Sequence, residues 1–111
     1  MKEKIEKLIE KYEYKRGRYN KLIYRPGFMT GGPREFFDGV IEEYDFVKGR
    51  LNLILQDYDP NENIVKLQLA IIIQVAFNHY GYVTSPSNEK DRGKNRALSS
   101  IIEDMRELVK E

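Results

Sequence analysis

The chain has 111 residues, of which 41% are hydrophobic and 33% charged, and this is the composition of one globular domain. Nineteen Lys and Arg against eighteen Asp and Glu leave a net charge of +1, so an electrostatic function requires local segregation of charge. The lack of cysteine and the single histidine exclude disulfides, thiol nucleophiles, cysteine-ligated metals and two-histidine metal centres.

The beginning of the chain does not have the pattern of a signal peptide. Residues 1 to 11 are rich in Lys and Glu, so we expect a cytoplasmic protein. The most apolar segment, residues 64 to 77, is too short to span a bilayer, and Lys66, Gln68 and Gln74 make it too polar. We therefore expect no membrane association.

The first predicted helix covers residues 2 to 24. Its apolar residues fall on one line at spacings of three and four: Ile5, Leu8, Tyr12, Tyr19 and Leu22. Lys15 interrupts that line and Gly17 follows it, a pattern compatible with a kink or a break there. Residues 25 to 33 contain three Gly and two Pro, so the sequence predicts a loop.

The second predicted helix, residues 34 to 58, has the most regular pattern in the chain. Apolar residues repeat there at alternating spacings of three and four: Phe37, Val40, Tyr44, Val47, Leu51, Ile54 and Tyr58. A turn follows, and Asp59 as N-cap, Pro60 as first helical residue and Glu62 in a capping box predict a third helix over residues 60 to 80.

The third predicted helix is apolar around its whole circumference. Eleven of the fourteen residues from 64 to 77 are apolar, which indicates a helix enclosed by its neighbours. A connector rich in Gly, Pro and Ser follows, and the last helix starts between residues 86 and 95. One apolar face characterises this last helix: Leu98, Ile101, Met105 and Leu108.

These elements predict an all-α protein with a single helical domain over residues 1 to 111. Four helices joined by short connectors favour a compact four-helix bundle with up-down-up-down connectivity. The third helix is expected to be the most buried, and both Gly/Pro-rich loops are expected at the same end of the bundle.

Basic residues are concentrated in one fifth of the chain. Residues 14 to 34 contain six basic residues and no acidic residue, whereas residues 35 to 111 contain nine basic and fourteen acidic residues. On a helix with 100° per residue, one stripe beside the apolar face collects seven cations. These are Lys4, Lys7, Lys11, Lys15, Arg18, Lys21 and Arg25.

A cationic stripe that contains an aromatic residue is typical of a surface that binds anions. Cations neutralise phosphates, Tyr14 or Phe28 would stack on exposed bases, and Phe28 with Met29 would equally anchor an acidic protein. The candidate residues are Lys11, Tyr14, Lys15, Arg16, Arg18, Lys21, Arg25, Phe28, Met29, Arg34, Arg92, Lys94 and Arg96. There is a simpler interpretation of the stripe. A helix in a small bundle needs a solvent-exposed side, and in this interpretation the cations only form that side without binding a partner.

The sequence does not match three specific motifs for binding phosphate or metal ions. The glycines of residues 27 to 32 lack the Gly-Lys-Ser/Thr ending of a P-loop, and residues 57 to 68 lack the central Gly and final Glu of a calcium loop. Carboxylates over residues 35 to 45 suggest the metal site of all-helical nucleotide pyrophosphatases, but no acidic residue occurs between Asn63 and Asn88 on the facing helix. His79, the last candidate, suits a helix C-terminus.

The sequence therefore favours a non-enzymatic binding or regulatory protein without cofactor or metal. It would dock through its basic flank and loop end onto nucleic acid, an acidic protein or a nucleoprotein complex. The alternative is a self-associating, homodimeric module or an inhibitor of a protein partner, with residues 37 to 58 and 64 to 77 partly forming the interface. The helix order is similar in outline to phage late-gene regulators, but no helix-turn-helix follows Gly81.

Overall fold

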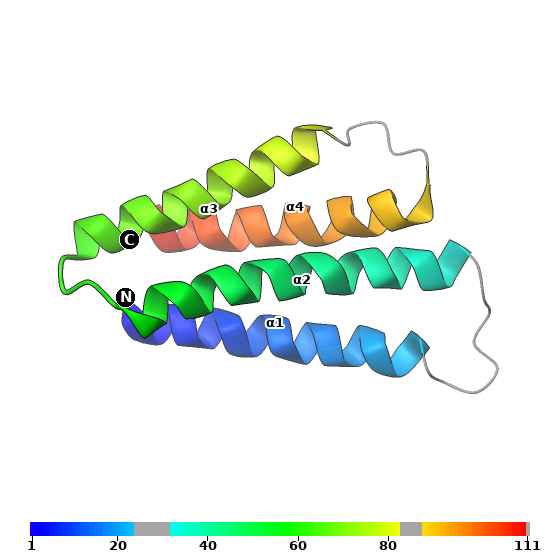
Figure 1. Ribbon diagram of the computed structural model, residues 1–111, viewed down its shortest axis with the longest axis horizontal. Coiled ribbons are helices and arrows are strands. Elements are labelled where there is room, and N and C mark those ends of the chain that lie inside the picture. The colour runs from blue at the N-terminus through cyan, green and yellow to red at the C-terminus, as the bar shows by residue number, and fades with distance from the viewer. Residues whose placement is uncertain (24–31, 83–87, 111) are drawn as a thin grey trace.

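The computed structural model describes residues 1–23, 32–82 and 88–110, and for residues 32, 33, 77 and 79 to 82 it describes the backbone only. Four helices run in alternating directions (Figure 1): α1 (Lys2–Ile23), α2 (Gly32–Gln56), α3 (Glu62–Tyr82) and α4 (Glu89–Lys110). The predicted all-α four-helix bundle with up-down-up-down connectivity is thus confirmed. The end of α1, the start of α2, the end of α3 and the start of α4 all lie at the same end of the molecule.

The boundaries of α2 and α3 each differ from the prediction by two residues at both ends, and the difference at the start of α3 has a clear cause. The expected capping box is wrong, because the Asp59 carboxylate accepts a hydrogen bond from the backbone N–H of Asn61 at 2.8 Å instead of capping the helix. The Asn61 side chain accepts from the N–H of Asn63 at 3.0 Å, so Asn61 is the N-cap and the helix begins at Glu62. Across Gly17, α1 continues without a break.

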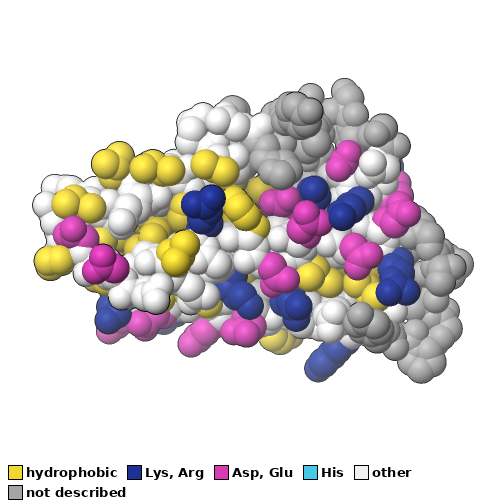
Figure 2. Space-filling view, in the orientation of Figure 1, with side chains coloured by type: hydrophobic (Ala, Val, Ile, Leu, Met, Phe, Trp, Pro, Cys, Tyr) yellow, Lys and Arg dark blue, Asp and Glu magenta, His cyan; other side chains and the backbone are white. Residues whose placement is uncertain are grey.

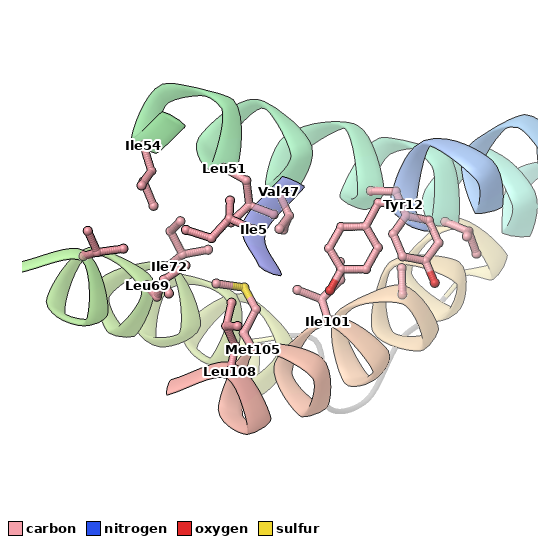
Figure 3. Packing of buried hydrophobic residues seen from close by; sticks show 14 residues of the cluster. Ile5, Tyr12, Val47, Leu51, Ile54, Leu69, Ile72, Ile101, Met105 and Leu108 are labelled. Atoms are coloured by element: carbon pink, nitrogen blue, oxygen red, sulfur yellow. The ribbon is translucent and has the colours of Figure 1, made fainter. Parts of the chain in front are cut away.

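The two central helices of the bundle are α2 and α4. Their mutual contact is the most extensive in the molecule, while α1 packs mainly on α2 and α3 mainly on α4. Figure 3 shows the core, where side chains from all four helices meet. Its members with no exposed surface include Ile5, Tyr12, Val47, Leu51, Leu69, Ile101 and Met105.

Two buried glycines bring α2 and α4 into backbone contact near the end where α4 begins. A Cβ atom on Gly39 would overlap the carbonyl oxygen of Lys90, and a Cβ atom on Gly93 would overlap the carbonyl oxygen of Phe36. A glycine of each helix therefore packs directly against a backbone carbonyl group of the other helix. Only glycine permits this separation, because any side chain would push the helices apart.

The expectation that the third helix is the most buried is wrong for the side chains that the structure describes. Val65, Leu69, Ile72 and Ala76 of α3 are buried. The opposite side of the helix stays open, because α3 touches α2 only over a short stretch. The exposed apolar residues of α3 are Ile64, Leu67, Ile71 and Val75. Even so, among the described residues no helix has the length and apolar content needed to cross a membrane.

Candidate functional site

The predicted cationic stripe of α1 lies along the seam between α1 and α4. In the half of the seam near the N-terminus, α4 supplies carboxylates that oppose the stripe: Lys4, Lys7 and Lys11 line a shallow groove together with Asp104 and Glu107. Two carboxylates thus face three lysines, and most of the basic charge of this half is offset within the molecule.

Asp104 holds α1 and α4 together in this half. It accepts hydrogen bonds from Lys11 Nζ at 2.9 and 3.0 Å and from the Tyr12 hydroxyl at 3.1 Å. The Tyr12 ring stacks on the ring of Tyr44 from α2, with 5.3 Å between centroids. Burial and the neighbouring Asp104 charge raise the pKa of Tyr12 far above its ordinary value, so the phenol remains a neutral donor. Lys11, a predicted binding residue, thus has an internal partner.

Replacing Asp104 with Ala is expected to destabilise the fold by about 1 to 3 kcal/mol, because it leaves the buried Tyr12 hydroxyl without an acceptor. Urea unfolding followed by circular dichroism measures this free energy. The control is the double variant Tyr12→Phe/Asp104→Ala, in which no hydroxyl is orphaned. Its loss should be smaller than the sum of the two single losses, and strict additivity would contradict the assigned hydrogen bond.

Arg16 points away from the seam, toward α2. Its Nε donates to the Asp45 carboxylate at 2.9 Å, and Lys48 lies 4.0 Å from the same group and 3.8 Å from Glu13. Arg16 therefore belongs to an ion-pair network between α1 and α2, separated from the other cations of the predicted site.

In the half of the seam nearer the end of α1, the two helices leave a cleft of about 580 Å³ between them. Helix α2 closes its floor with Phe37 and Tyr44. The walls come from α1 and α4: Lys15, Arg18, Tyr19 and Leu22 on one side, and Arg96, Ser99, Ser100 and Glu103 on the other.

The cleft brings together three predicted binding residues from two helices, Lys15, Arg18 and Arg96. Within the part of the chain that the structure describes, none of them forms an ion pair with a carboxylate. Among the described residues of the lining, Glu103 is the one acidic residue against three cations, so these residues carry a surplus of positive charge. This surplus lies in a concave surface, where low-dielectric walls focus the electrostatic field.

Aromatic rings lie beside two of these cations. Lys15 Nζ lies 5.7 Å from the centroid of the Tyr44 ring and 3.4 Å from the Ser100 hydroxyl. The Arg18 guanidinium lies 6.0 Å from the ring of Tyr14, whose side chain is 67% exposed just outside the cleft. Positive charge, hydroxyl groups and aromatic faces therefore meet in one site.

The remaining predicted residues lie outside the cleft. Lys94 and Lys90 hold Glu42 at 3.4 and 3.1 Å. Desolvation acts to raise the pKa of Glu42, but the hydrogen bond from Lys90 and the charge of Lys94 outweigh it and lower that pKa. Arg92 pairs with its neighbour Glu89 at 3.5 Å. Two exposed cations, Lys21 and Arg34, flank the cleft end of the molecule, while Arg25, Phe28 and Met29 lie outside the described residues.

Several residues of the cleft were not predicted from the sequence. Ser99, Ser100 and Glu103 face α1 because they share one side of α4 with Arg96, at spacings of three and four. This spacing, read from the sequence, would have placed the three residues on the same side of the helix as Arg96. In the described residues, no group of three or more His, Asp or Glu side chains is placed to hold a metal ion. Comparisons with protein-family models, curated proteins and solved structures found no match to this chain.

Proposed function

We propose that this protein is a non-enzymatic binding protein that holds single-stranded nucleic acid in the cleft between α1 and α4. The observation that supports the proposal is the convergence of Lys15, Arg18 and Arg96 on one concave surface, where none of them forms an ion pair with a carboxylate of residues 1–23, 32–82 or 88–110. Cations left unpaired in a cleft are available to neutralise phosphates and release counterions.

The shape and chemistry of the cleft favour a single strand over a duplex. A duplex is a convex rod and does not enter a cleft of about 580 Å³, whereas an unpaired nucleotide does. Tyr14 offers an exposed ring for base stacking, and Tyr19 and Phe37, whose ring centroids are 5.2 Å apart, line the interior. Cations that follow the backbone beside aromatic faces for the bases are the usual means of binding single strands.

The salt dependence of binding tests this proposal. We expect a fluorescent oligothymidylate of about 20 nucleotides to bind more weakly as salt rises from about 50 to about 200 mM. Three phosphate contacts correspond to a slope of about −2 in log K against log salt. Fluorescence anisotropy measures the slope, with a hairpin duplex of the same length as the matched ligand.

Two outcomes would contradict the proposal. Binding with no salt dependence would show that phosphate neutralisation does not drive the interaction. Failure to bind any oligonucleotide, combined with salt-sensitive binding of a poly-glutamate peptide, would assign the cleft to an acidic protein instead.

A further inference from the structure

An apolar surface on α3 and α2 is left uncovered by the part of the chain that the structure describes. On α3, the residues Ile64, Leu67, Ile71 and Val75 recur at spacings of three and four and are 40 to 62% exposed. Leu53 of α2 is 60% exposed beside them. Figure 2 shows hydrophobic side chains gathered over α3 and the adjoining part of α2, with few charged side chains among them. We call this surface, Leu53 together with the four α3 residues, the apolar face.

The apolar face contains both a ridge and a groove. Leu67 and Ile71 form the ridge, with 62% and 56% of their surfaces exposed. Between α2 and α3 lies a groove of about 210 Å³. Its lining includes Leu53, Ile54, Gln68, Ile71 and Ile72, with Arg50 at its edge. A two-fold axis across this face would place the ridge of each copy in the groove of the other.

We propose that the apolar face is the interface through which two copies of this chain form a homodimer. The face has few charges: Lys66 is the only charged residue of α3 after Glu62, and Arg50 lies at the edge of the groove. An interface here would therefore depend mainly on burial of apolar side chains, and the ridge and groove of a second copy offer such side chains. The heptad residues of α2 are not available for this purpose, since Val40, Val47 and Leu51 are buried in the core of the monomer.

The apolar face is small, because only five side chains, each 40 to 62% exposed, form it. We expect an interface at the lower end of the stable range, with a dissociation constant on the order of micromolar.

The cleft between α1 and α4 shares no lining residue with the groove between α2 and α3. Dimerisation therefore leaves the cleft open, and the inference does not depend on the proposed nucleic-acid function. A homodimer would carry two clefts.

Sedimentation velocity from about 1 to about 500 µM tests the dimer. The wild-type chain should shift from monomer to dimer over this range. Leu67→Glu and Ile71→Glu should each raise the dissociation constant by at least about tenfold, because they place a charge in the apolar interface. Both side chains are more than half exposed in the monomer, so both variants should fold. Tyr14→Glu, a similar change at an exposed ring of α1, should leave the dimer intact.

A second measurement uses the lack of cysteine in the chain. Leu67→Cys or Ile71→Cys should form an intermolecular disulfide under mild oxidation much faster than Tyr14→Cys. Monomers at every concentration would overturn the proposal, as would a dimer that persists in both glutamate variants. Neither result would affect oligonucleotide binding by the monomer, so failure of the dimer and failure of the proposed function are distinguishable.

Discussion

Gly93→Ala is expected to lower the free energy of unfolding by about 3 kcal/mol or more. The added methyl group would overlap the carbonyl oxygen of Phe36, which belongs to the backbone of α2 and cannot rotate away. The two central helices would have to separate, and every core contact between them would loosen. Thermal unfolding followed by circular dichroism should show a midpoint lower by roughly 10 °C or more.

Gly49→Ala is the matched control for this substitution. Gly49 lies within α2, and no atom of another residue approaches the position of its absent Cβ. Alanine there should stabilise the helix by about 0.5 to 1 kcal/mol. If Gly93→Ala were as stable as wild type, the backbone contact between α2 and α4 would not exist in solution.

Reversing two charges in the cleft, Arg18→Glu with Arg96→Glu, is expected to weaken oligonucleotide binding by about 100-fold or more at low salt. Two of the three converging cations would then repel phosphate, and the lining would have a net negative charge. The salt slope should disappear together with the affinity. Fluorescence anisotropy measures both quantities in one titration.

The control variant, Lys2→Glu with Arg106→Glu, changes the net charge of the protein by the same amount at exposed positions outside the cleft. It separates the effect of the cleft from the effect of total charge. Equal losses in the two variants would show that binding follows net charge and would remove the assignment of the site to the cleft. Circular dichroism of both variants confirms that each remains folded.

The sequence was sufficient to predict the four helices, because their signals are local. The heptad pattern from Phe37 to Ile54 lies on the face that α2 buries against the other helices, whereas Tyr58, its last predicted position, lies beyond the end of α2 at Gln56. The start of α3 was misplaced by two residues, since Asp59 and Asn61 both have side chains suited to capping. Which of them caps the helix depends on the turn that enters it.

The arrangement of the helices around the core was not predictable in the same way. Asp104 is 93 residues from Lys11 in the sequence, so no local pattern predicts the contact between the two side chains. The roles of Gly39 and Gly93 were not predictable, because a glycine inside a helix ordinarily destabilises that helix. Glycine is required at these positions only because the backbone of the other helix approaches them. The position of α3 beside α4, with only a short contact to α2, is likewise a matter of contacts that no local pattern in the sequence encodes.

The one-sided attachment of α3 has a consequence for the motions of the domain. The ion pairs of Lys11 with Asp104, Arg16 with Asp45 and Lys90 with Glu42 all join α1, α2 and α4 to one another. Detaching α3 breaks none of these three ion pairs. It also leaves intact the backbone contact between α2 and α4 at Gly39 and Gly93. We therefore expect the backbone amides of α3 to exchange hydrogen with water through a partial opening that requires less free energy than global unfolding. In that opening α3 would separate while α1, α2 and α4 stay together.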